Sequence, residues 1–147
     1  MIGSLQAGEI EQAQQWLAVR EFRHATRFSR PNADATRAIR EVASRDVPVT
    51  DAILAVQADL FDTYQARLNE ALATVRAVDA RGFTARRAEA GALAEGYFSI
   101  LAPAYAEQRG ETAAATVRAL FAALRQATQS GDDVVGALTE VEQALRG

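Results

Sequence analysis

Apolar side chains recur every three to four residues along almost the whole chain, and this periodicity restricts the fold to packed α-helices. Almost no segment alternates apolar and polar residues as a half-buried strand does. The nine glycines and three prolines lie mainly between the periodic segments, where they end helices. The pattern therefore predicts an all-α fold, an antiparallel bundle of five or six helices with short connections.

The longest predicted helix covers residues about 51–80, and near-heptad spacing of its apolar residues is typical of bundle packing. Its predicted inward positions are Leu54, Phe61, Leu68, Leu72 and Val75. Before it, one helix is expected over residues 9–28 and a shorter one up to Ser44, with Pro31 between them and Asn32 or Asp34 as the cap of the second.

Three further helices are predicted after the long one. Gly82 should end the long helix and Thr84 should cap the next, which covers residues 85–108 with Leu93, Tyr97 and Ile100 facing inward. Pro103 should bend or split that helix. The following helices cover residues 112–128 and the segment after the cap Asp132, and they are separated by Gly131.

Composition sets the class of protein. A chain of 147 residues, 49% hydrophobic and 24% charged, is expected to form one folded domain over residues 1–147. A net charge of -3 gives no reason to expect nucleic acid or an anionic membrane as a partner. No apolar run reaches the roughly 18 residues of a membrane span, and no signal peptide is visible, so the chain is expected to be soluble, either alone or as part of a larger protein.

Arginines concentrate near the end of the first predicted helix. Residues 20–40 contain six arginines and two acids, and four of the arginines are spaced to share one helix face. These four are Arg20, Arg23, Arg27 and Arg30. One interpretation is a polar seam between helices, which includes Asp34 and in which the arginines bind neighbouring carboxylates. The alternative is a site for an anion or an acidic partner.

Carboxylates beside the apolar faces are the candidate metal ligands. Glu21 lies three residues before His24 on the apolar side of its helix, but the single histidine excludes a conventional di-iron site. On the following helices, Asp62 flanks the apolar face, Glu89 aligns with that of the next helix, and Asp59 points away with Glu70. Gln65 is expected inside the apolar face, and Tyr97 or Tyr105 could add a phenolate. These oxygens suit a hard cation, and a buried polar network is the alternative.

Signatures of catalysis are absent from the sequence. It has no phosphate-binding glycine loop, no zinc motif, no nucleophile elbow and no histidine beside a candidate nucleophile. The protein is therefore not expected to be an enzyme.

Three segments resemble one protein family in order and spacing. They are REFRHATRFSRPNADATR (residues 20–37), DLFDTYQARLNEAL (residues 59–72) and AEGYFSILAPAYAEQRG (residues 94–110). Together they are similar to the extracytoplasmic helical domain that precedes the membrane part of bacterial FTR1-type iron permeases. The resemblance extends over nearly the whole chain.

The resemblance implies an accessory role in iron uptake on the outer face of the cytoplasmic membrane. The domain would bind iron transiently or dock a partner, either the permease membrane domain or an iron-delivery protein. Direct iron binding would use Glu21, Asp62 and Glu89, with Tyr97 and Asp59 as weaker candidates. The R-E-x-x-E motif of the membrane helices is missing here, because residues 20–24 read REFRH. The transport residues therefore do not carry over, and a purely structural or protein-interaction module is the alternative.

Overall fold

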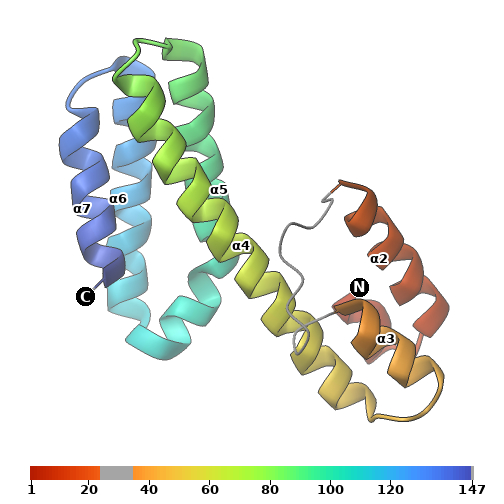
Figure 1. Cartoon of the computed structure of the whole chain (residues 1–147). Helices are drawn as coiled ribbons and strands as arrows, with labels where there is room; N and C mark the ends of the chain where they lie inside the picture. Colours follow the sequence, from red (N-terminus) through yellow and green to blue (C-terminus); the bar gives the residue numbers. More distant parts are fainter. Residues whose placement is uncertain (24–34, 147) are drawn as a thin grey trace. The chain divides into compact units, whose positions relative to one another are not determined.

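The computed structural model describes residues 1–23 and 35–146, without the side chains of residues 17–23 and 36. Its described residues are mainly helical and contain no strand, which confirms the all-α prediction. The helices are α1 (Ile2–Gln6), α2 (Ile10–Arg23), α3 (Ala35–Ala43), α4 (Val49–Asp79), α5 (Thr84–Arg109), α6 (Glu111–Ser130) and α7 (Val134–Arg146) (Figure 1). The long predicted helix is α4, and the short α1 was not predicted.

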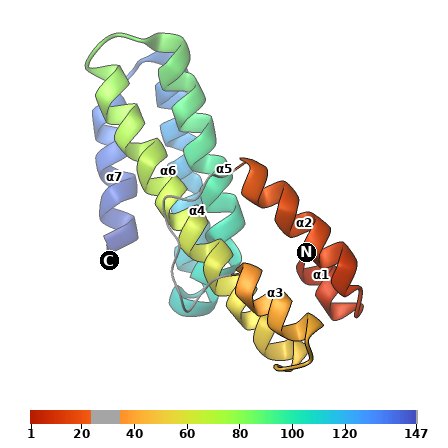
Figure 2. The same cartoon turned by 45° about the vertical axis from the view of Figure 1, so that its right-hand side comes forward.

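The chain divides into two compact units, Met1–Thr63 and Tyr64–Gly147, and α4 contributes to both. Unit 1 combines α1, α2, α3 and the first part of α4 (Figure 2). Each of these helices contributes buried side chains to one small core, and the largest are Leu5, Ile39 and Val56. The expectation of a single domain over residues 1–147 stays a prediction.

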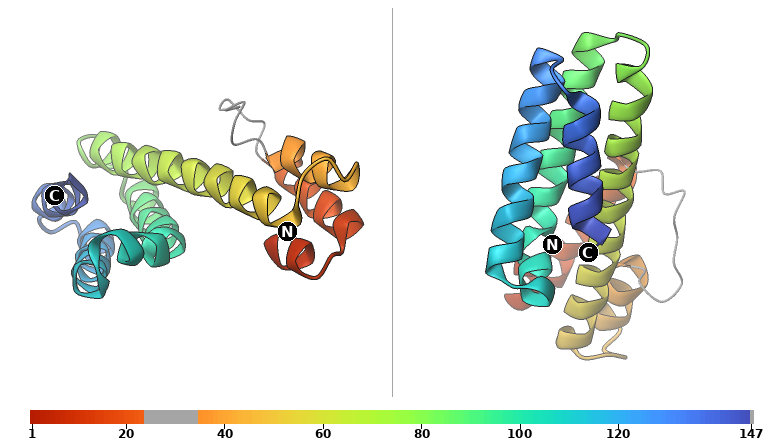
Figure 3. Two further views of the ribbon diagram at one scale, coloured as in Figure 1. Left: turned by 90° about the horizontal axis from the view of Figure 1, so that it is seen from below. Right: turned by 90° about the vertical axis from the view of Figure 1, so that its left-hand side faces the viewer.

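Unit 2 is a four-helix bundle formed by the second part of α4 with α5, α6 and α7 (Figure 3, right). Short connections make successive helices antiparallel, as predicted. Phe98 of α5 and Phe121 of α6 stack in its core with ring centroids 4.7 Å apart. α5 contains Pro103 and continues as one helix to Arg109, so the proline does not split it.

The predicted stops at Gly82 and Gly131 are confirmed, whereas the predicted caps Thr84 and Asp132 are wrong. The predicted stop at Pro31 and the cap at Asn32 or Asp34 lie outside the described residues. Gly82 and Gly131 both have positive φ angles where α4 and α6 end. Thr84 is the first residue of α5 and makes no capping bond, because Phe83 occupies the N-cap position. At α7, Asp133 takes the role assigned to Asp132, since its Oδ1 accepts a hydrogen bond from the backbone N–H of Gly136 at 3.2 Å.

Several large apolar residues predicted to face inward lie on the surface. Leu54 of α4 is 64% exposed, and Leu93 and Ile100 of α5 are each 45% exposed. The buried face of α5 instead consists largely of small residues. They are Ala90, Gly91, Ala94, Ala102 and Ala106, together with Phe98 and Leu101. Small side chains allow two helix backbones to approach closely. The core therefore uses the alanine- and glycine-rich face of α5, although its single residues are less hydrophobic than leucine or isoleucine.

The close approach of α5 and α6 is centred on Gly91 and Thr128. A Cβ atom built on Gly91 would lie 2.9 Å from the Cβ of Thr128, closer than real side chains pack. Thr128 is itself fully buried, and its hydroxyl donates to the carbonyl oxygen of Arg125 at 2.8 Å. This contact fixes the spacing of the two helices, and it thereby decides which face of α5 remains outside.

Candidate functional site

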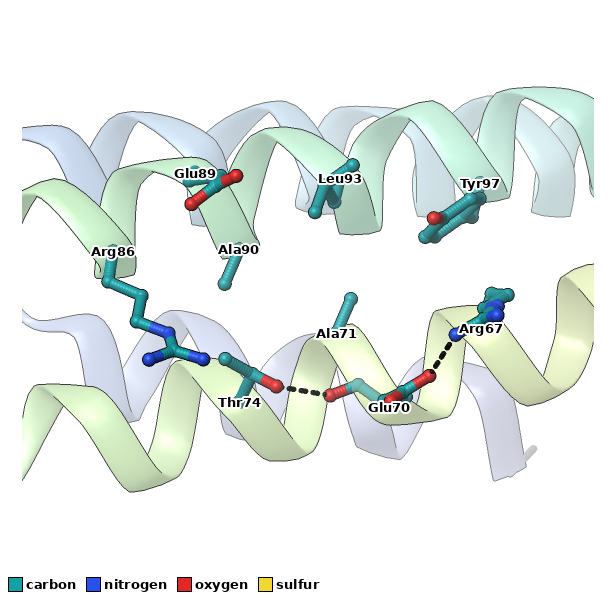
Figure 4. Close-up of a pocket in the computed structure, with 9 residues that line it drawn as sticks. All are labelled: Arg67, Glu70, Ala71, Thr74, Arg86, Glu89, Ala90, Leu93 and Tyr97. Atoms are coloured by element: carbon teal, nitrogen blue, oxygen red, sulfur yellow. Dashed lines mark hydrogen bonds and ion pairs between the residues drawn. The ribbon is translucent and has the colours of Figure 1, made fainter. Parts of the chain in front are cut away.

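A groove of about 250 Å³ runs between α4 and α5 in unit 2 (Figure 4). Side chains of α4 form one wall and side chains of α5 form the other. The lining residues are Arg67, Glu70, Ala71 and Thr74 of α4, and Arg86, Glu89, Ala90, Leu93 and Tyr97 of α5. Two alanines at the floor leave the space open, and charged groups surround it. The groove therefore presents oxygen and guanidinium groups to solvent at one place.

Helical spacing organises the α4 wall. Arg67 and Glu70 are three residues apart, and the Arg67 Nη1 atom donates to the Glu70 Oε2 atom at 2.8 Å. The Thr74 hydroxyl donates to the backbone carbonyl oxygen of Glu70 at 2.8 Å. Because both side chains of the ion pair are well exposed, solvent screens their attraction. Glu70 thus has a partner that a competing cation could displace at small cost.

The α5 wall carries two of the predicted metal ligands. Glu89 is exposed and forms no ion pair with another described residue. Tyr97 is half-buried, and its ring lies 6.1 Å from that of Tyr64 between centroids. Arg86 extends from α5 toward Thr74 across the groove (Figure 4). Sequence reasoning missed Arg67, Glu70 and Arg86 as neighbours of Glu89.

The other predicted ligands belong to unit 1. Asp62 is half-buried on α4, whereas Asp59 is only 7% exposed. The prediction that Asp59 points away is therefore wrong. Asp59 shares one face of α4 with Ala52 and Val56, at spacings of three and four residues, and all three are buried. Gln65, predicted to lie inside the apolar face, is exposed.

The remaining predictions fall where the structure gives no side chains. Glu21, Arg20 and Arg23 lie in α2, but their side chains are outside the described residues. His24, Arg27, Arg30 and Asp34 are outside the described residues altogether. Both the polar seam and the role of Glu21 stay predictions.

Other arginines pair internally within unit 2. Arg76 of α4 contacts both carboxylate oxygens of Glu142 on α7, at 2.8 and 2.7 Å. Arg125 of α6 reaches Glu95 of α5 at 2.9 Å. These bonds link neighbouring helices across the bundle. They show that arginines of this chain hold neighbouring helices together.

Among the side chains that the structure describes, which exclude that of Glu21, no three acidic or histidine groups gather closely enough to form a metal-binding cluster. Among the helices of residues 1–23 and 35–146, none has both the length and the apolar character needed to cross a bilayer. The fold and groove define a helical module with an open, charged groove and no organised metal centre in the described part. The class is that of an all-α helical module.

Comparison with known families identifies the module. The family model described as iron permease FTR1 N-terminal domain matches residues 1–144, almost the full length of the chain. The chain belongs to this family, which confirms the resemblance drawn from its three segments. FTR1 iron permeases are transporters and not enzymes. Comparison with curated proteins and with solved structures gives no significant match.

Proposed function

We propose that this chain is the accessory domain of an iron-uptake permease and binds iron transiently in the groove of unit 2. The family match over residues 1–144 supports the permease context. The observation that carries the iron site is that Glu89, Tyr97 and Glu70 all line one groove. Carboxylate and phenolate oxygens are the ligands that hard cations such as ferric iron prefer.

The charges around the groove favour weak binding. A cation entering it must compete with Arg67 for Glu70, and it approaches the second guanidinium of Arg86. Glu89 supplies a carboxylate that needs no displacement of an ion-pair partner within the described residues. Such a site suits cargo that passes on to a transporter better than iron that is stored. In this proposal the domain acts at the outer face of the cytoplasmic membrane, and its role is not catalytic.

Titration calorimetry with ferric citrate and with ferrous iron tests the iron site. The wild-type chain should bind saturably at micromolar to millimolar metal, and Glu89→Gln and Tyr97→Phe should each weaken binding. Glu140→Gln is the matched control, because Glu140 is an exposed carboxylate on α7 that does not line the groove. Absence of saturable binding would exclude iron binding. Equal loss in the control variant would show nonspecific attraction to surface charge.

A second candidate is a protein-interaction module of the permease without a metal site. The internal pairing of Arg76 with Glu142 and of Arg125 with Glu95 supports it, because these charges serve the bundle and not a ligand. Its partner would be the permease membrane domain or an iron-delivery protein. Iron titration distinguishes the two candidates, since the interaction module is expected to show no saturable uptake of metal.

A further inference from the structure

The solvent side of α5 carries a continuous apolar strip. The strip consists of four residues at spacings of three, four and three, which place them on one helix face. They are Leu93, Gly96, Ile100 and Pro103. All four are exposed, and the two largest are each 45% exposed. We call these four residues the outer face of α5. Scattered apolar residues are common on protein surfaces, but a contiguous strip on one helix indicates a contact surface.

The core of unit 2 makes no use of this face. The face of α5 that points into the bundle contains Gly91, Ala94 and Phe98, which are all buried. The close contact of Gly91 with Thr128 fixes this orientation of the helix. At the centre of the outer face, a Cβ atom on Gly96 would meet nothing within 4 Å. The glycine therefore leaves a shallow notch between Leu93 and Ile100 into which another helix can pack closely.

We propose that the outer face of α5 binds the same face of a second copy, with the two α5 helices antiparallel. The sequence is complementary to itself in this arrangement. A two-fold axis passing between residues 96 and 97 brings Leu93 of one copy opposite Ile100 of the other, and each contact occurs twice. The glycine notches of the two copies then meet at the centre of the interface.

Charge complementarity supports this choice of partner. The same two-fold axis places Arg86 of one copy opposite Glu107 of the other along the paired helices. Both residues are exposed, and neither forms an ion pair with another described residue of its own chain. Arg86 is exposed and lies seven residues before Leu93 on the same side of α5, so its side chain can turn from the groove to the partner. Two such pairs at the rim would fix register and orientation.

The size of the contact predicts a weak dimer. One pair of helices buries less than the roughly 1,600 Å² of a standard stable interface. We therefore expect association that depends on protein concentration, with a dissociation constant on the order of 10 μM to 1 mM. This inference concerns self-association and does not depend on iron binding in the groove.

Sedimentation equilibrium over that concentration range tests the dimer with the full chain. Ile100→Glu should raise the dissociation constant at least about tenfold, because two carboxylates would be buried against apolar side chains. Val135→Glu is the control, since Val135 is an even more exposed aliphatic residue at the start of α7. The control should leave association unchanged. A wild-type chain that is monomeric throughout, or a dimer that persists in Ile100→Glu, would overturn the proposal.

Charge reversal tests the antiparallel register. Arg86→Glu and Glu107→Arg should each weaken the homodimer, because each places two like-charge pairs across the interface. The double variant should associate like the wild type. Mixing the two single variants should give a mixed dimer tighter than either homodimer, since both of its pairs are then attractive. Failure of the double variant and of the mixture to recover association would overturn the proposed arrangement.

Discussion

The guanidinium of Arg87 lies 3.0 Å from the carboxylate of Asp79, so that a largely buried cation of α5 is neutralised by the last residue of α4. The same guanidinium donates from its Nε atom to the backbone carbonyl oxygen of Thr128 at 2.9 Å. Three helices therefore meet at one side chain. The carbonyl lies near the C-terminal end of α6, where the helix dipole also favours a positive charge.

Removing the carboxylate should destabilise unit 2. The Arg87 side chain is only 9% exposed, so Asp79→Asn leaves a nearly buried cation without its counter-charge. Removing one partner of a fully buried ion pair lowers the free energy of unfolding by about 3–5 kcal/mol. Because Asp79 is partly exposed, we expect Asp79→Asn to lower it by about 2 kcal/mol. Urea unfolding followed by circular dichroism measures this change. Glu142→Gln, which breaks the pair with the exposed Arg76, should cost less than about 1 kcal/mol.

Replacing Gly91 or Gly96 of α5 by alanine should change the stability of unit 2 in opposite directions. Gly91→Ala forces a methyl group against Thr128, and such overpacking typically costs about 1–3 kcal/mol. Gly96→Ala meets open space in the same helix, where alanine is favoured by up to about 1 kcal/mol. Thermal unfolding at low protein concentration compares the two variants. Equal destabilisation by both would contradict the close contact between α5 and α6.

The stacked aromatic pair should dominate the core of unit 2. Phe121 is fully buried against Phe98, and truncating a buried phenylalanine to alanine costs about 3–5 kcal/mol. Phe83→Ala is the matched control, because Phe83 is 54% exposed in the connection between α4 and α5. The free energy of unfolding, measured by chemical denaturation, should be at least about 2 kcal/mol lower for Phe121→Ala than for Phe83→Ala. A similar cost for both substitutions would mean that Phe121 is not a core residue.

The fold class and the helix order follow from the sequence because helical periodicity and glycine stops are local signals. Gly82 and Gly131 end helices through their own backbone conformation, so the neighbouring sequence suffices to place them. The orientation of α5 depends on something else. Leu93 and Ile100 are more apolar than Ala90 or Ala94, yet the alanines face inward, because the contact at Gly91 brings α6 close. That fit between two helices is a tertiary property.

The candidate site could be predicted only in part for the same reason. Glu89 and Tyr97 share the groove because they lie eight residues apart on one helix, which spacing alone indicates. Their neighbours Arg67 and Glu70 come from α4, and only the packing of α4 on α5 brings them together. Asp59 was misplaced because its face of α4 carries the small Ala52, which adds little to an apolar pattern but packs in the core of unit 1.

A fragment that begins at Tyr64 should fold without the preceding residues. The buried side chains of its four helices come from within residues 64–147, among them Val75, Phe98, Phe121 and Val141. A domain that contains its own core keeps cooperative unfolding when it is separated from its neighbours. We expect helical circular dichroism and one thermal transition for residues 64–147. The fragment 1–63, whose core is smaller, should be less stable, because short chains bury a smaller fraction of their surface. Loss of cooperative unfolding in the longer fragment would instead support the prediction of a single domain over residues 1–147.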